Sequence, residues 1–178
     1  MSLATPDWSS VGILGDALLT VDVLEHLGGQ LESARRLLSI VLQQATAIRL
    51  GSIPEVVRLA GVLQAEMHRR SLIEVERGGL LEHAARTLGV KPTEVSLAML
   101  EQVVDDQWRA VTRGRADELR GLLAEVQREH DGDRLLIQHE LALHRSRGRP
   151  EEAGYQAALQ SIADVVPISL EMQAFLQR

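Results

Sequence analysis

The chain of 178 residues contains no cysteine and very few aromatic residues. Without cysteine it has no disulfide bond, no thiolate metal site and no cysteine nucleophile. Its aromatic side chains are Trp8, Trp108, Tyr155 and Phe175, so Leu, Val, Ile and Ala must fill the interior, as they do where helices pack on helices. Alternating runs of β-branched and aromatic residues, which indicate strands, are missing. We therefore expect an all-α fold.

The sequence also lacks the features of several functional classes. The net charge of −6 gives no overall positive field that would hold nucleic acid. No run of about 18 apolar residues is present to insert into a membrane. Residues 1–7 lack the basic start and apolar centre of a signal peptide. The expected location is the cytoplasm.

Catalytic signatures are missing as well. The chain has no Gly-x-Ser-x-Gly, no Walker-type loop and no Gly-x-Gly-x-x-Gly. Neither Glu-x-x-His nor His-Glu-x-x-His occurs, and His139, Glu140 and His144 have the spacing of an ordinary solvated helix face. The arginines Arg145, Arg147 and Arg149 lack interleaved aromatic residues for stacking on bases. We expect no enzymatic activity, no cofactor and no metal.

The longest predicted element lies between Ser52 and Gly89. Ser52-Ile53-Pro54-Glu55 has the pattern of a capping box with proline in the first turn. Gly89 suits the left-handed residue that follows many helices. A continuous helix of about 35 residues between these signals would be about 50 Å long. Because such a helix needs partner helices along its length, we predict an elongated bundle.

Before this element we expect residues 1–15 to be weakly ordered and a short helix over 16–27 to end at Gly28-Gly29. A long helix over 30–50 then forms an antiparallel hairpin with the helix that follows. Its predicted buried face, spaced at three and four residues, consists of Leu31, Ala34, Leu38, Val41, Leu42, Ala45 and Ile48.

After Gly89 we expect a connection over 90–114 that contains an accessory helix and ends at Gly114. A third long helix over 116–146 follows, with a weak point at Asp131-Gly132-Asp133 and a loop over 145–150. The predicted organisation is one helical domain over 1–178, with a bundle over 16–146 and a helical tail over 147–178. The fold class is thus an elongated antiparallel bundle of three long helices with short accessory helices.

Polar residues interrupt two of the apolar faces. Arg77 falls on the face of the second long helix that carries Leu80 and Ala84, and His130 and Asp133 fall on that of the third. If the second and third long helices pair antiparallel, Arg77 lies opposite His130 and Asp133. A guanidinium removed from water needs a counter-charge, which predicts a structural polar layer with an Arg77–Asp133 contact. The alternative is that Arg77 lays its stem on the core and keeps its head in water.

The sequence from Leu31 to Leu59 resembles the first helix and following turn of the FlgN family of flagellar export chaperones. Glu74-Val75-Glu76-Arg77, Leu80-Leu81 and Leu88-Gly89 are similar to the Glu-x-x-Arg, Leu-Leu and Leu-Gly of that family. At the family's Asn-x-x-Asn-x-x-Leu-Ile this chain has His130, Asp133, Leu136 and Ile137, and Gly154-Tyr155 follows later. The resemblance covers roughly residues 31–160.

The resemblance implies a cytoplasmic chaperone for type III protein export in flagellum assembly. Its partners would be amphipathic C-terminal helices of the hook-associated (hook–filament junction) proteins and the flagellar export apparatus. Apart from the resemblance, an exposed apolar patch on the tail over 151–176 would favour a homodimer when no client is bound. A client helix would lie in a groove between helices. The candidate partner-binding residues are Leu136, Ile137, Leu141, Tyr155, Leu159, Ile162, Val166, Leu170, Met172 and Phe175.

Two alternatives stay open at the level of the sequence. The apolar tail over 151–176 either receives a client or packs on its own bundle. A helical signalling or scaffold protein, such as a histidine-phosphotransfer-like module, is the second functional reading. It needs an exposed histidine in mid-helix beside a basic residue, and His68 with Arg69 and Arg70 is the candidate position.

Overall fold

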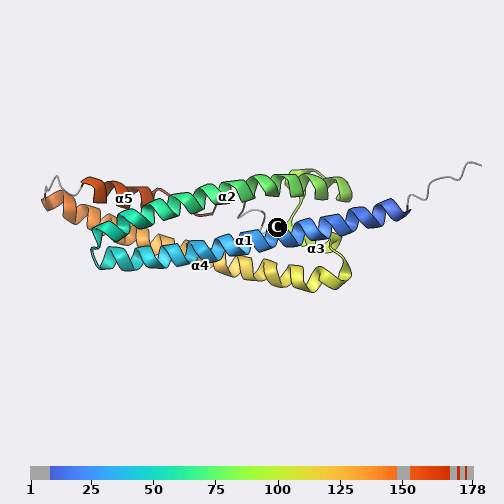
Figure 1. The fold of residues 1–178 in the computed structure, drawn as a ribbon, viewed down its shortest axis with the longest axis horizontal. Helices are drawn as coiled ribbons and strands as arrows, with labels where there is room; N and C mark the ends of the chain where they lie inside the picture. Colours follow the sequence, from blue (N-terminus) through green and yellow to red (C-terminus); the bar gives the residue numbers. More distant parts are fainter. Residues whose placement is uncertain (1–8, 148–152, 169–171, 173–174, 176–178) are drawn as a thin grey trace, which may run out of the picture.

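A computed structural model describes residues 9–147, 153–168, 172 and 175 (Figure 1). Within these residues the chain is all-helical, which confirms the predicted class. The elements are α1 (Ser9–Arg49), α2 (Ile53–Leu88), the 3₁₀ turn η1 (Pro92–Glu94), α3 (Leu97–Val103), α4 (Asp106–Arg147) and α5 (Ala153–Ala163).

Helices α1 and α2 form an antiparallel hairpin, as predicted. Gln30 Nε2 donates to Glu74 Oε1 at 3.0 Å, and fourteen residues further along α1, Gln44 Nε2 donates to the Leu59 carbonyl at 3.5 Å. The residue numbers of the contacts on α2 fall as those on α1 rise, so the two helices run antiparallel.

Helix α4 runs parallel to α1 on another side. The backbone N–H of Asp105, just before α4, donates to Thr20 Oγ1 at 3.1 Å, and Arg115 Nη1 donates to the Leu24 carbonyl at 2.7 Å. The numbers of both partners rise together. Helix α1 therefore packs against both α2 and α4, and the long helices lie lengthwise beside one another (Figure 1).

The predicted break at Gly28-Gly29 is wrong, because α1 is one helix of 41 residues. The helix begins at Ser9, seven residues before the predicted start at 16, and residues 1–8 lie outside the described residues. Each glycine costs a helix about 1 kcal/mol. Burial of the adjacent Leu27 and Leu31, 1% and 5% exposed, contributes about 1.5–3 kcal/mol each. Tertiary packing thus outweighs the local signal.

The predicted break at Gly114 is wrong as well. The chain leaves α3 at Val104, whose backbone is extended, and α4 already begins at Asp106. Thr112 and Ala116 on either side of the glycine are fully buried, and their packing holds the helix across it. Helix α4 also continues through Asp131-Gly132-Asp133 and reaches Arg147, so the expected loop cannot begin at 145.

The ends of α2 agree with most of the local signals. Gly89 has φ +69°, in the left-handed region that glycine adopts without strain, and its N–H donates to the Ala85 carbonyl. Pro54 lies in the first turn, as predicted. The capping box does not form: the Ser52 side chain makes no cap bond. Glu55 accepts instead from Arg58 Nε at 2.9 Å.

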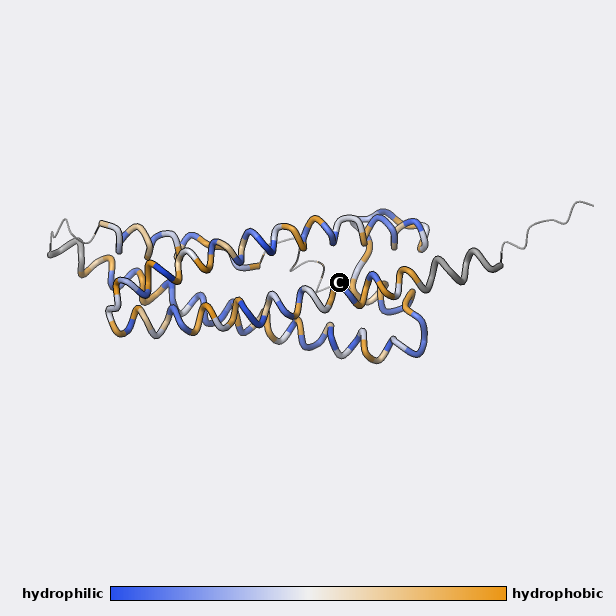
Figure 2. Tube along the Cα trace, viewed as in Figure 1, coloured by the Kyte–Doolittle hydropathy of each residue, from blue (hydrophilic) through white to orange (hydrophobic). Residues whose placement is uncertain are grey.

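The core consists of two apolar clusters along the bundle, and hydrophobic positions recur along all the long helices (Figure 2). Most of the buried face predicted over 30–50 is confirmed, but Leu42 is 45% exposed and Leu37, which was not predicted, is fully buried. On the predicted apolar side of the third long helix, Leu122, Leu136 and Leu141 are half-buried. The other residues of that side and the two polar residues on its face are buried, namely Leu119, Leu123, Val126, His130, Asp133 and Ile137.

Candidate functional site

Helix α5 packs along the seam between α2 and α4. Both helices pack along α1, and α5 packs against both of them (Figure 1). Tyr155, Leu159 and Ile162 of α5 are at most 2% exposed. They share one apolar cluster with residues of α2 and α4, including Leu59 and Ile137. An amphipathic helix thus lies in a groove that the rest of the bundle provides.

Beyond α5 the chain continues towards the second apolar cluster. The carbonyl of Val165 lies 3.0 Å from Nε2 of His130 on α4, and the ring nitrogen acts as the donor. Ile168, Met172 and Phe175 are 5%, 1% and 5% exposed and belong to the cluster around the other half of the bundle. The guanidinium of Arg77 lies 5.5 Å from the centre of the Phe175 ring, a cation–π contact.

These positions settle the packing of the described tail residues. Six of the candidate partner-binding residues are buried in the chain's own bundle, Leu136 and Leu141 are half-buried, and Val166 is 68% exposed. Leu170 lies outside the described residues. Of the two interpretations left open by the sequence, packing on the chain's own bundle is the one that this structure contains. The six buried residues are Ile137, Tyr155, Leu159, Ile162, Met172 and Phe175.

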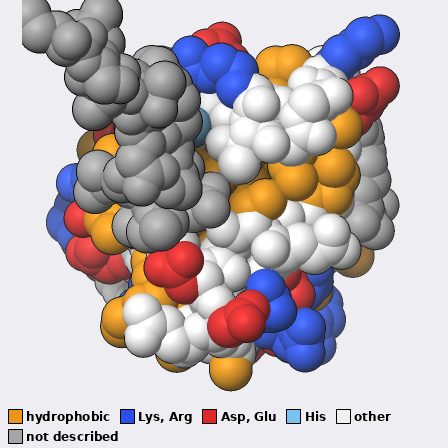
Figure 3. All heavy atoms as spheres, turned by 90° about the vertical axis from the view of Figure 1, so that its right-hand side faces the viewer, with side chains coloured by type: hydrophobic (Ala, Val, Ile, Leu, Met, Phe, Trp, Pro, Cys, Tyr) orange, Lys and Arg blue, Asp and Glu red, His pale blue; other side chains and the backbone are white. Residues whose placement is uncertain are grey.

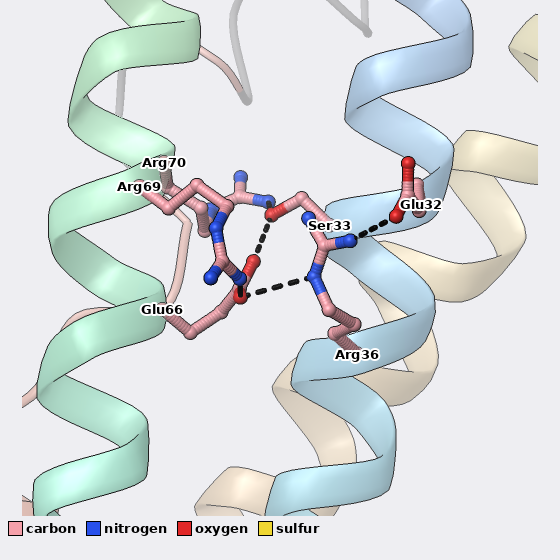
Figure 4. Close-up of polar contacts among 6 residues, drawn as sticks. All are labelled: Glu32, Ser33, Arg36, Glu66, Arg69 and Arg70. Atoms are coloured by element: carbon pink, nitrogen blue, oxygen red, sulfur yellow. Dashed lines mark hydrogen bonds and ion pairs between the residues drawn. The ribbon is translucent and has the colours of Figure 1, made fainter.

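A polar belt connects α1 and α2 between the two apolar clusters (Figure 4). Glu66, 2% exposed, accepts from Ser33 Oγ at 2.7 Å and from Arg36 Nε at 3.1 Å, and it pairs with Arg69. Arg70 Nη1 reaches the same Ser33 hydroxyl at 3.4 Å. Burial lowers the pKa of Arg70, and the nearby carboxylates of α2 oppose this shift.

The polar belt continues along α2 through Glu74, which accepts from Gln30 and pairs with Arg77. Of all these residues, the sequence predicted only Arg77 as part of a buried polar layer. The signal for the rest was present, since residues 66, 70, 74 and 77 recur at three and four positions and therefore share a face of α2. The belt ends beside a surface hollow of about 320 Å³ that separates α2 from the tail. Its lining residues are Met67, Arg70, Ser71, Glu74, Arg77, Val166 and Pro167.

The predicted Arg77–Asp133 contact is wrong. Arg77 pairs with Glu74 at 2.8 Å and acts electrostatically on His26, whereas the basic side chain that acts electrostatically on Asp133 is Arg49. His26 and Arg49 are about 23 residues apart on α1, or about 35 Å along the helix axis. The error came from the assumed register of α2 against α4. The alternative prediction, that the Arg77 guanidinium stays in water, is wrong as well, because this side chain is only 12% exposed.

His130 and Asp133 are nevertheless buried on one face of α4, each 1% exposed. Burial lowers the pKa of His130, and its contact with the Val165 carbonyl opposes the shift. Burial also raises the pKa of Asp133 to about 7, against the attraction of Arg49. Among the described residues Asp133 Oδ2 has no hydrogen-bond partner. The carboxyl group is therefore protonated over much of the acidic range.

His26 is a third buried titratable group, 9% exposed on α1. Neither of its ring nitrogens has a hydrogen-bond partner among the described residues. Burial lowers its pKa to about 4, with Glu74 acting in the opposite direction. The imidazole is therefore neutral near pH 7.

The alternative histidine, His68, is exposed in the middle of α2. Its two arginine neighbours are engaged elsewhere, Arg69 with Glu66 and Arg70 with Ser33. Within the described part of the chain, no three His, Asp or Glu side chains are grouped as metal ligands are. In the same part, none of the helices has the combined length and apolarity that crossing a membrane requires.

The end of the molecule near α3 exposes hydrophobic side chains between charged ones (Figure 3). In the chain segments that meet there, Leu18, Val21, Trp108 and Val111 are each more than 40% exposed.

Comparison with known proteins adds no relative, since no protein-family model, no curated protein and no solved structure matches the chain. The fold and the groove define the molecule as a helical protein whose own C-terminal helix lies between α2 and α4.

Proposed function

We propose that this chain is a non-enzymatic binding protein that holds amphipathic helices of other proteins. The long helices form the body, and the groove between α2 and α4 is the binding surface. In line with the resemblance to the FlgN family, the clients are C-terminal helices of hook–filament junction proteins. The protein keeps them available in the cytoplasm and delivers them to the flagellar type III export apparatus.

The observation that carries this proposal is the docking of α5. Its apolar face, with Leu159 and Ile162 fully buried, fits between α2 and α4, while Gln64 Nε2 donates to Ser161 Oγ at 2.8 Å at the exposed edge. A buried apolar stripe with a polar rim is the usual arrangement for recognition of a helix in a groove. The groove of which α5 fills one half thus has the chemistry that an amphipathic client helix requires.

A pull-down with the full chain and the C-terminal helices of the junction proteins from the same genome tests the proposal. We expect capture at tens of micromolar or tighter. The matched control is the same helices with their apolar stripe replaced by serine, which we expect not to be captured. If the unmodified helices are not captured at these concentrations, the chaperone proposal is wrong.

The histidine-phosphotransfer reading makes a different prediction. It has one observation in its favour, the exposure of His68 in mid-helix. Under that reading, a small phosphodonor such as acetyl phosphate labels the wild-type chain and fails to label His68→Gln. We expect no labelling of either chain.

A further inference from the structure

We propose that Ile168, Met172 and Phe175 occupy the client site in cis, so that the chain's own C-terminal end is a substitute for a client helix. The inference rests on the proposed function and specifies the partner. The site selects a helix with an aliphatic residue, a second apolar residue four positions later and an aromatic residue three positions beyond that.

The spacing of the buried tail residues supports this assignment. Positions 168, 172 and 175 follow the i, i+4, i+7 pattern by which an amphipathic helix presents one face to a groove. All three are buried within one cluster that also contains Leu80 of α2 and Leu119 of α4. The same seam therefore accepts apolar residues along both halves of the bundle, from α5 to Phe175.

The aromatic position is the most specific of the three. The guanidinium of Arg77 lies 5.5 Å from the centre of the Phe175 ring, and Glu74 fixes this guanidinium from the same helix at 2.8 Å. A cation held over an aromatic face favours a ring over an aliphatic side chain of similar size. The site thus contains a built-in preference for an aromatic residue at the last position.

The short connection between α5 and Ile168 is less buried than the segments on either side of it. Pro167 cannot donate a backbone hydrogen bond and disfavours helical geometry at the preceding residue, so α5 cannot continue into the tail. Val166 is 68% exposed above the hollow of about 320 Å³, which Arg70, Glu74 and Arg77 also line. The connection between α5 and Ile168 is therefore non-helical and partly exposed, so α5 and the three buried tail residues are separate contacts with the bundle.

The test uses the full chain and a fluorescent synthetic peptide with the sequence of residues 165–178. In Met172→Asp the tail is expelled, because a carboxylate cannot stay in this apolar cluster. We expect this variant to bind the peptide at least about tenfold more tightly than the wild-type chain, in which the tail competes. The matched control is Leu135→Asp, a similar change at a residue that is 68% exposed on α4. It should bind the peptide as the wild-type chain does.

Peptide variants test the selectivity. The peptide with Phe175→Ala should bind Met172→Asp at least about tenfold more weakly than the unmodified peptide. This difference should shrink when Arg77→Met is added to the protein. Equal binding of both peptides to Met172→Asp overturns the aromatic preference. Failure of the unmodified peptide to bind Met172→Asp overturns the proposal as a whole.

A disulfide lock gives an independent test that does not depend on the folding of Met172→Asp. Since the chain has no cysteine, Ser71→Cys with Val166→Cys creates a single pair across the hollow. The junction-protein helices should bind the reduced form and not the oxidised form. If they bind both forms equally, the client uses another surface: the chaperone proposal then stands and the inference of a cis occupant is wrong. If they bind neither form while Met172→Asp binds the tail peptide, the cis site stands and the client assignment is wrong.

Discussion

Ser33 on α1 donates a 2.7 Å hydrogen bond to Glu66 on α2, a carboxylate that is 2% exposed in the middle of the bundle. Arg36 and Arg69 bind the same carboxylate. The two apolar clusters are therefore joined by a charged belt whose groups satisfy one another.

Glu66→Ala should destabilise the protein by about 3 kcal/mol, because it leaves the Ser33 hydroxyl and Arg36 without the carboxylate that they bind and removes a negative charge near the buried Arg70. Urea denaturation followed by circular dichroism measures the change. The control is Glu118→Ala, which removes the exposed ion pair with Arg35 and should cost less than about 1 kcal/mol. Equal effects of the two substitutions would mean that the belt contributes no more than a surface pair.

Asp133→Asn should stabilise the protein by about 2 kcal/mol near pH 8 and change little near pH 4. The folded protein keeps the Asp133 proton up to a pKa of about 7, whereas the unfolded chain loses it near the ordinary value. Between these values the folded state binds more protons, so the stability of the wild-type chain falls as pH rises. Denaturation curves at several pH values measure this, and a variant less stable than wild type at pH 8 contradicts it.

His26→Leu tests the opposite slope. Burial lowers the pKa of His26 to about 4, so between the ordinary value and about 4 the unfolded chain binds more protons and stability falls as pH falls. Asp133 acts in the reverse direction over the same window. We compare the free energy of unfolding of His26→Leu with that of wild type at two pH values. The difference should favour the variant by about 2 kcal/mol more near pH 4.5 than near pH 8. The double variant with Asp133→Asn should depend on pH less than either single variant.

Leu159→Ala should destabilise the chain by about 2–5 kcal/mol, the usual cost of truncating a buried leucine. The residue is fully buried between α2 and α4. Val166→Ala, at a residue that is 68% exposed, is the control and should cost less than about 0.5 kcal/mol. Thermal unfolding of both variants measures the difference. If Leu159→Ala is as stable as the control, α5 does not pack as part of the body.

Features that depend on local chemistry could be predicted from the sequence. The helical class, the end of α2 at Gly89 and the buried face from Leu119 to Ile137 follow from turn chemistry and residue period, and the structure has all of them. These signals act within a few residues, and at these positions the rest of the fold agrees with them, in contrast to the glycines at 28, 29 and 114.

Features that depend on distant parts of the chain could not be predicted in the same way. Continuity of α1 through Gly28-Gly29 depends on other helices, because Leu27 and Leu31 beside the glycines are buried in the core and Arg115 Nη1 of α4 donates to the Leu24 carbonyl. The Arg77–Asp133 hypothesis failed because the register of two helices that are not neighbours in sequence is set by α1 between them. The partner of Arg77 is one turn away, at Glu74.

Hydrogen–deuterium exchange of the full chain, with and without a junction-protein C-terminal helix, tests the central claim most directly. We expect the client to raise exchange at the backbone amides of Val165, Val166, Ile168, Met172 and Phe175, while protection in α2 and α4 is kept or increased. An unchanged tail, together with new protection on a surface away from the seam of α2 and α4, would contradict the account.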